Sequence, residues 1–443
     1  MFRHFPSHLD RRLVGLVLLG LVPLLFLPKI NIVSFAGHTS GVRIDDILLA
    51  SFGFFGLCVH YCLRIPLLGV EKWIMVWVLT GLLSIGFNQV VYEGDGKDVV
   101  MGVFYALRPL EYFLFFYLGL VAAQWMNIQK LIYGFVGVTA VIIVLQAAKL
   151  IGSFTVTGVH SVTGMASFDS EMGAMLNLLY CYVAFAPRHE TVSCFKVLPK
   201  VWIAIPSSLR PLFNGIRNVA PVALVLLCQV LVNHRTSIAV FLFLSLVRGM
   251  MASGKVRYTS LGLIVLMIFL LFTVVGTESY LFRRSAKLFN LDNFQMITVA
   301  WENVDLDHMP QVQGDVHLPV DMSWWMRLHK WCYALKHFIH KPLAICFGIG
   351  PGFLGPALDG GVLRLLVEYG LAGSLCFFGA ITCLWRTGRQ MKWVVSALLL
   401  NMILFDAHLA YKLMSLFFFL GGAAHFQRNS EADPVEMATT RRK

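Results

Sequence analysis

Twelve apolar segments run the length of this chain and leave it few ways to fold. The chain is long enough for roughly a dozen membrane-spanning helices of about 20 residues plus loops. Only 14% of the residues are charged and 58% are hydrophobic, whereas a soluble domain carries about 25% charged residues. In a membrane the backbone must satisfy its own hydrogen bonds, and these segments are too long and apolar for barrel strands. The sequence therefore predicts an all-α polytopic membrane protein with spans at about 13–28, 45–64, 72–92, 103–124, 129–151, 172–187, 219–233, 236–252, 258–277, 360–384, 392–405 and 409–424.

Basic residues gather in alternate loops, as they do on the cytoplasmic side of membrane proteins. The loop 188–218 holds five Lys or Arg residues against one acid, whereas the loop 152–171 holds Asp169 and Glu171 and no Lys or Arg. This alternation predicts that both termini are cytoplasmic (N-in, C-in). It also accounts for the net charge of +12 without nucleic acid as a partner. The first apolar run lacks a small-residue cleavage site and is predicted to be a retained helix.

One loop, 278–359, is far longer than the others and is predicted to lie outside, between the ninth and tenth spans. Long loops in membrane enzymes usually carry function. Within it, residues 323–341 have the spacing of an amphipathic helix, with Ser323 as N-cap and Lys341-Pro342 as its stop. Its tryptophans suit a helix resting at the membrane interface. The chain is thus divided into spans (1–277), this loop (278–359), further spans (360–425) and a cytoplasmic tail (426–443).

Charged residues gather on the predicted outer side, at or within the ends of the spans. A charged side chain costs free energy in a membrane, so residues kept there are candidates for function. Several arginines on one face suggest a phosphate or pyrophosphate ligand, because the guanidinium fork binds such oxygens bidentately. The alternative is that they reach lipid headgroups or pair with the acids of the loop. The residues concerned are Arg235, Arg283, Arg284, Arg327, Asp359, Asp406, His408 and Lys412.

The stretch DGGVLRLLVEYGLAG at 359–373 opens the tenth predicted span. Asp359 is placed as its N-cap, a position that would keep the carboxylate charged and make it a weaker base. Arg364 and Glu368 have the i, i+4 spacing of a pair within the bundle. Gly370 and Gly373 are predicted to let a neighbouring helix pack closely. The preceding GIGPGFLGP at 348–356 lacks the strand and the GKS or GKT ending of a phosphate loop, and is predicted to be a flexible connector.

Three segments in this order resemble the bacterial O-antigen polymerase and O-antigen ligase family. Asp359-Gly360 is followed by nine residues, Gly370, two residues and Gly373, which matches the ligase signature except that Asp359 replaces its histidine and Gly360 its Asn-like residue. Asp at this place is common among the polymerases. The other two segments are Arg235-Thr236-Ser237 and the run from Met326-Arg327 through Trp331 and Lys341-Pro342 to the glycine-rich turn. The resemblance covers about residues 230–425, and before that only the topology is similar.

The resemblance implies a GT-C-like glycosyltransferase of the bacterial inner membrane, with its site facing the periplasm. The donor would be an oligosaccharide on undecaprenyl pyrophosphate, held by Arg235 and Arg327 as its charge develops. Asp359 would orient or deprotonate the acceptor hydroxyl, with inversion at the anomeric carbon. Because the arginines supply charge and the leaving group needs no proton, neither a metal nor a cofactor is expected. Further substrate contacts would come from Arg283, Arg284, His408 and Lys412.

Other functions stay open at this point. An O-antigen ligase would transfer the glycan to lipid A-core or to protein, although the histidine missing at 359 counts against it. A flippase or other transporter of polyprenyl-linked glycans usually has internal repeats and midplane charges, which the sequence lacks. A structural subunit of an export complex would use the arginines to bind lipid. Chain-length regulators or export proteins are the protein partners to expect of a polymerase.

Overall fold

The computed structural model describes residues 31–34, 41–43, 68–92, 96–153, 162–166, 168–185, 210–252, 254–275, 292–306, 322–355 and 358–432. The predicted spans 13–28 and 45–64 lie outside these residues, as do Arg283 and Arg284. Ser323 is described only as part of a helix backbone.

Among the described residues, the regular secondary structure is helical except for one antiparallel strand pair, β1 (Asn31–Ser34) and β2 (Gly41–Arg43). This pair is a small departure from the predicted all-α class. The helices are α3 (Gly69–Tyr92), α4 (Gly96–Trp125), α5 (Ile128–Ala147), α6 (Asp169–Ala184), α9 (Arg210–Val232), α10 (Arg235–Met251), α11 (Lys255–Leu270), α13 (Asp292–Asn303), α14 (Met322–His340), α15 (Ala344–Phe347), α16 (Gly361–Trp385), α17 (Arg389–Met402) and α18 (Tyr411–Ala432). Two short turns of helix, η3 (Leu271–Val275) and η4 (Ala407–Leu409), complete them.

Ten predicted apolar segments fall among the described residues, and each overlaps a helix. Among the described helices, four contain stretches long and apolar enough to cross a membrane: Gly69–Val91, Val99–Gln124, Ile128–Ala147 and Gly361–Trp385. Shorter apolar stretches occur at Ala220–Val232 and Arg257–Thr273. The protein is therefore helical, with apolar helices that suit a membrane.

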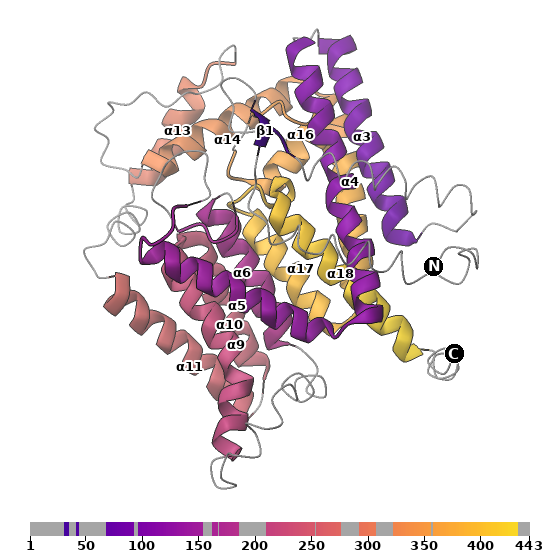
Figure 1. Ribbon diagram of the computed structural model, residues 1–443. Coiled ribbons are helices and arrows are strands. Elements are labelled where there is room, and N and C mark those ends of the chain that lie inside the picture. The colour runs from indigo at the N-terminus through magenta and orange to yellow at the C-terminus, as the bar shows by residue number, and fades with distance from the viewer. Residues whose placement is uncertain are drawn as a thin grey trace, which may run out of the picture.

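The carboxyl-terminal helices form the centre of the bundle. Figure 1 shows α16, α17 and α18 between α3 and α4 on one side and α5, α6, α9, α10 and α11 on the other. The tightest of these contacts joins α4 to α18, where Gly119 lies against the carbonyl of Phe419 and Gly422 against the carbonyl of Phe116. Both helices use a glycine at the crossing, so their backbones touch with no side chain between them.

The described parts of the loop 278–359 form a second, smaller core. Apolar residues of α13, α14 and α15 pack there with Ile349, Leu354 and Leu358, among them Ala300, Leu328 and Phe338. Helix α14 confirms the amphipathic helix predicted at 323–341, and it ends just before Lys341-Pro342. It begins at Met322, so Ser323 lies inside it and is not its N-cap. Its apolar face packs on the protein, and its position at the membrane interface stays a prediction.

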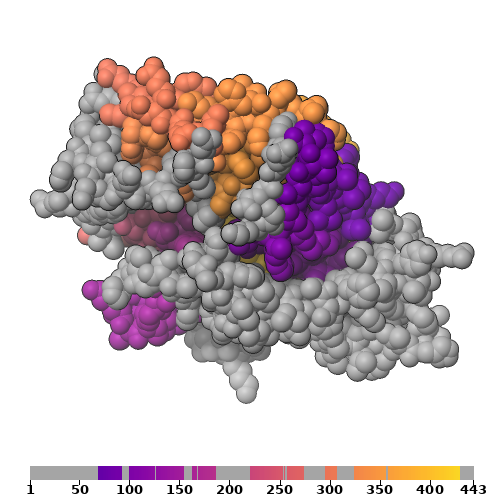
Figure 2. Space-filling view, turned by 90° about the horizontal axis from the view of Figure 1, so that it is seen from above, coloured from indigo at the N-terminus to yellow at the C-terminus, as the bar shows by residue number. Residues whose placement is uncertain are grey.

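Helix α16 is interrupted at Gly370, where φ is 64° and ψ is −170°. The carbonyls of Val367 and Glu368, released by this break, accept hydrogen bonds from the backbone of Ile349 (2.9 Å) and Gly350 (3.0 Å). The described part of the glycine-rich stretch 348–356 is therefore hydrogen-bonded to a broken helix, which differs from the flexible connector predicted. Gly370 turns the backbone and also permits close packing of a neighbouring helix, as predicted, because a Cβ there would lie 2.5 Å from the carbonyl oxygen of Cys346 in α15. In Figure 2 the segment containing α14 and α16 lies beside the ends of α3 and α4.

Candidate active site

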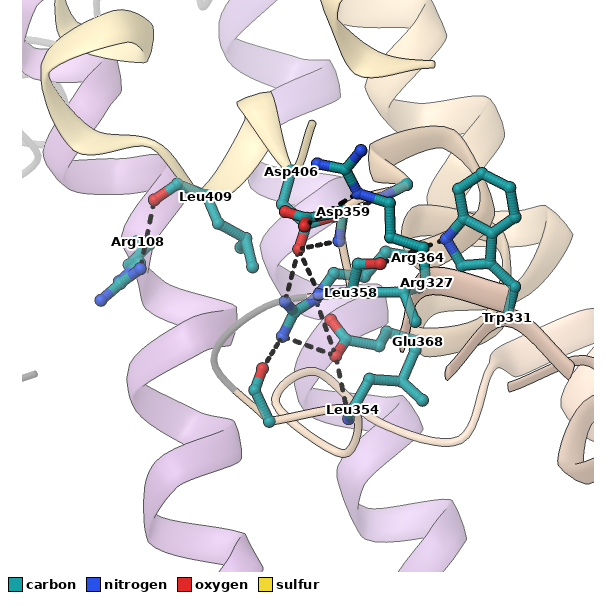
Figure 3. Close-up of polar contacts among 12 residues, drawn as sticks. Arg108, Arg327, Trp331, Leu354, Leu358, Asp359, Arg364, Glu368, Asp406 and Leu409 are labelled. Atoms are coloured by element: carbon teal, nitrogen blue, oxygen red, sulfur yellow. Dashed lines mark hydrogen bonds and ion pairs between the residues drawn. The ribbon is translucent and has the colours of Figure 1, made fainter. Parts of the chain in front are cut away.

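Arg327 and Asp359 meet at the junction between the loop core and α16. Arg327 Nε donates to Asp359 Oδ2 at 3.1 Å, and the two side chains are 19% and 39% exposed. One turn further along α14, Trp331 Nε1 donates to the carbonyl of Leu358 at 3.1 Å, which fixes α14 against the residue before Asp359 (Figure 3). The structure thus brings together two predicted catalytic residues that lie 32 positions apart, and leaves their pair open to solvent.

The backbone of Asp359 is held by a second aspartate. Asp359 has a left-handed φ of 58°, and the residue that caps α16 is Gly360, with no side-chain cap bond. The prediction that Asp359 caps this helix was therefore wrong. Asp406 takes the place in front of the helix, since its carboxylate accepts from the backbone N–H groups of Leu358 (2.8 Å), Asp359 (3.3 Å) and Gly360 (3.1 Å). The Asp359 side chain is consequently free of the cap and points to Arg327.

A buried ion network lies directly beneath this turn (Figure 3). Arg364 contacts Glu368 at 3.1 Å and Asp406 at 3.0 Å, and also donates to the carbonyl of Gly355. The predicted pairing of Arg364 with Glu368 is confirmed, but Asp406 is a second partner that the sequence spacing did not indicate. Burial alone would raise the pKa of Asp406, yet the nearby Arg364 and the backbone donors outweigh it and hold that pKa below its usual range. Asp406 therefore stays charged and keeps the turn at Asp359 in place.

Arg235 opens α10 from a different part of the chain, next to His234, the N-cap of that helix. Burial lowers the pKa of His234 below its ordinary value, and four charged residues are close enough to act on it electrostatically. These are Asp169, Arg327, Asp359 and Arg235. The three predicted catalytic residues thus all act electrostatically on one histidine, although they come from α10, α14 and the turn before α16.

The remaining predicted contacts divide into two groups. Arg283 and Arg284 lie outside the described residues. His408 and Lys412 are each only 1% exposed, so they are buried beneath the surface rather than presented on it as a substrate contact requires. Lys412 lies beside the ring of Tyr411, and its backbone N–H donates to Glu171. The physical reason for the difference is that α18 begins at Tyr411 inside the bundle, not at its rim.

His408 predicts a pH dependence of stability. Its burial lowers the pKa to about 3 from 6.5, with Asp406 opposing and Arg364 and Arg108 reinforcing the shift. The unfolded chain takes up a proton below pH 6.5 that the folded protein cannot, so stability falls as the pH drops from 6.5 towards 3. We expect His408 to account for a loss of about 2 kcal/mol by about pH 5, at ~1.4 kcal/mol per pH unit.

The measurement is thermal unfolding of the purified protein at neutral pH and at about pH 5, for the native chain and for His408→Phe. Phenylalanine has a similar shape and packs beside Phe377, whose ring already faces His408. The variant should lose less stability on acidification than the native chain. An equal loss in both proteins would show that His408 is not the group responsible.

Neither family models nor curated protein sequences give a match to this chain. The site therefore rests on its own geometry. The sequence did not predict the roles of two members of the site, the helix cap at His234 and the support of the turn by Asp406. The cap position of His234 was readable from the sequence, since it directly precedes Arg-Thr-Ser at the start of an apolar run. The hydrogen bonds around Asp406 could not be read from the sequence in the same way, because its partners lie 42 to 48 residues away.

Proposed function

We propose that this protein is a glycosyltransferase of the bacterial inner membrane that polymerises polysaccharide repeat units carried on undecaprenyl pyrophosphate. One observation carries the proposal: Arg327 and Asp359 form an ion pair open to solvent, and both of them, with Arg235, act electrostatically on His234. Two guanidinium groups beside one carboxylate suit a reaction in which a pyrophosphate leaves and a sugar hydroxyl attacks. In this proposal the chain has about twelve spans with both termini in the cytoplasm, a GT-C-like arrangement and a site that faces the periplasm.

The pairing of Arg327 with Asp359 gives the proposed reaction an order. Without substrate, Arg327 Nε is engaged by the carboxylate at 3.1 Å. A bound pyrophosphate would compete for the same guanidinium, because charge-assisted bonds to phosphate are equally strong and can be bidentate. Asp359 is then released to hold the acceptor hydroxyl. The donor would therefore bind before Asp359 can act on the acceptor.

The chemical step is a single displacement at the anomeric carbon. The acceptor oxygen forms the new bond to C1, the bond from C1 to the pyrophosphate oxygen breaks, and the configuration inverts. The hydroxyl proton passes to Asp359, and the negative charge that develops on the leaving group is stabilised by Arg235 and Arg327. Because the pyrophosphate leaves as an anion, no general acid is needed on that side.

Single substitutions in the native host test the proposal. Arg327→Lys and Arg235→Lys each keep the positive charge but remove the guanidinium fork. Asp359→Asn removes the negative charge and keeps the shape of the side chain. Arg257→Lys is the control, since this exposed arginine lies at the start of α11, beyond the other end of α10. We expect the first three variants to leave single repeat units on the acceptor, seen on a gel of surface polysaccharide, while the control gives normal chains.

Other outcomes of this gel would point elsewhere. Full-length polymer retained on the carrier lipid would indicate a ligase. Repeat units trapped on the cytoplasmic side would indicate a flippase. Normal chain lengths from all three variants at normal expression would remove the basis for an active site here.

A further inference from the structure

His234 is held in place by its own helix. Its Nδ1 lies 3.0 Å from Ser237 Oγ and 3.4 Å from the backbone nitrogen of Ser237, whose N–H it accepts as the N-cap of α10. A histidine in this place is unusual, because Ser, Thr, Asp and Asn are the preferred N-caps. The cap uses Nδ1 of the ring and leaves Nε2 able to bind another group.

The cap also decides which ring nitrogen carries the proton. A neutral imidazole has one N–H, and its other nitrogen is an acceptor. Burial keeps His234 neutral by lowering its pKa. Since Nδ1 accepts from Ser237, the proton is on Nε2, and among the described residues Nε2 has no hydrogen-bond partner. The imidazole therefore presents an unused N–H donor.

A buried polar network makes this donor rigid. The carbonyl of Ser237 accepts from Asn177 Nδ2 at 3.1 Å, and Gln229 Nε2 donates to Asn177 Oδ1 at 2.9 Å. Gly173 on α6 lies so close to Ser237 that a side chain there would collide with the hydroxyl. Asn177 of α6 thus holds Ser237, Gln229 of α9 holds Asn177, and Ser237 in turn holds the ring of His234.

The surroundings of this donor select its ligand. Arg235 and Arg327 both act electrostatically on His234, and so do Asp169 and Asp359. Asp169 is the strongest of these charges, and the two aspartates balance the two arginines while Asp359 is paired with Arg327. A phosphate that displaces Asp359 from Arg327 would leave two arginines against one aspartate near the ring, which favours an anion there. A neutral N–H donor near these arginines adds directionality to a site for phosphate oxygens without adding charge.

We propose that His234 is a third pyrophosphate-binding residue, whose Nε2–H donates a hydrogen bond to a phosphate oxygen of the polyprenyl pyrophosphate donor. The inference rests on the proposed function, because it takes the donor from there. Arg235 and Arg327 provide the charge, and His234 fixes the orientation of the pyrophosphate relative to Asp359. Its contribution is that of one hydrogen bond to a charged group, which corresponds to about tenfold in affinity.

Two substitutions separate the two ring nitrogens. His234→Asn places an amide oxygen where Nδ1 is and keeps the cap, but has no group at the position of Nε2. His234→Gln places an amide near Nε2 and loses the good cap. The measurement is binding of undecaprenyl pyrophosphate, followed as ligand-induced thermal stabilisation of the purified full-length protein, with undecaprenyl monophosphate as the comparison lipid.

We expect opposite effects on the two quantities. His234→Asn should unfold at the native temperature yet bind the pyrophosphate about tenfold more weakly. His234→Gln should bind within about threefold of the native protein but unfold at a lower temperature, since it loses the N-cap of α10. A merely structural histidine would give the reverse pattern, with His234→Gln the weaker binder.

The experiment distinguishes this inference from the proposed function. Native binding by His234→Asn overturns the inference. If Arg327→Lys still weakens binding in that case, the proposed function stands without His234. If the native protein does not respond to undecaprenyl pyrophosphate at all, both the inference and the proposed donor are overturned.

Discussion

Replacing Arg364 with methionine will destabilise the protein strongly, by about 3–5 kcal/mol, the usual consequence of removing one partner from a buried ion pair. Arg364 is fully buried and serves two carboxylates, Glu368 at 3.1 Å and Asp406 at 3.0 Å. Methionine fills a similar volume, so the loss is electrostatic rather than a cavity. Both acids would then be left charged in the interior, or would have to take up protons.

The effect should reach the site as well as the stability. Asp406 holds the backbone of Leu358, Asp359 and Gly360, and Arg364 holds Asp406. Once Asp406 is uncompensated, the turn that directs Asp359 towards Arg327 loses its support. We therefore expect Arg364→Met to abolish chain elongation even in the fraction of protein that folds.

Thermal unfolding and monodispersity of the purified variant provide the measurement. Arg257→Met is the matched control, because Arg257 is exposed and should tolerate the same change. Arg364→Met combined with Glu368→Leu should recover part of the loss, since it removes one of the two stranded carboxylates. A single Arg364→Met variant as stable as the control would contradict the network described here.

Local patterns in the sequence predicted much of this fold. The apolar runs located every described helix of the bundle, because membrane spans are defined by length and hydropathy alone. The spacing of residues 323–341 predicted α14, and the i, i+4 rule predicted the contact between Arg364 and Glu368. Each of these features is decided within one or two helical turns, which is the range over which sequence spacing is informative.

The site depends on contacts that no local pattern contains. Asp359 looks like an N-cap from its position, but Asp406, 47 residues further on, takes the backbone donors there. Trp331 fixes α14 to Leu358, which lies 27 residues further along the chain. The break in α16 at Gly370 frees carbonyls that bond the backbone of Ile349 and Gly350, about 20 residues earlier. Tertiary packing decides whether Asp359 or Asp406 accepts from the backbone N–H groups in front of α16. The sequence was compatible with either residue in this role.

Gly370 should tolerate no side chain, and alanine there will release the segment 346–350 from α16. Its φ of 64° with ψ of −170° belongs to a region that is open essentially only to glycine, and another residue is strained by about 1–3 kcal/mol. A Cβ would also lie 2.5 Å from the carbonyl oxygen of Cys346 and from the nitrogen of Gly348. Both atoms are backbone, so the neighbour cannot move aside by changing a rotamer.

Release of this segment would leave polar groups without partners inside the bundle. The N–H groups of Ile349 and Gly350 would lose their bonds to α16, and the carbonyl of Val367 would lose its partner, while that of Glu368 would keep only the hydroxyl of Ser84. Each such unmade bond costs about 1–3 kcal/mol. Gly370→Ala should therefore be among the most damaging small substitutions in the chain.

Hydrogen exchange of the peptide containing Ile349 and Gly350 measures the release directly. Exchange there should become fast in Gly370→Ala, and the temperature of unfolding should fall. Gly86→Ala is the control, because a Cβ at Gly86 on α3 meets no atom within 4 Å and alanine favours a helix. Slow exchange at Ile349 in the Gly370 variant would mean that the N–H groups of Ile349 and Gly350 keep their bonds to α16 and that alanine fits the broken helix, which would contradict this prediction.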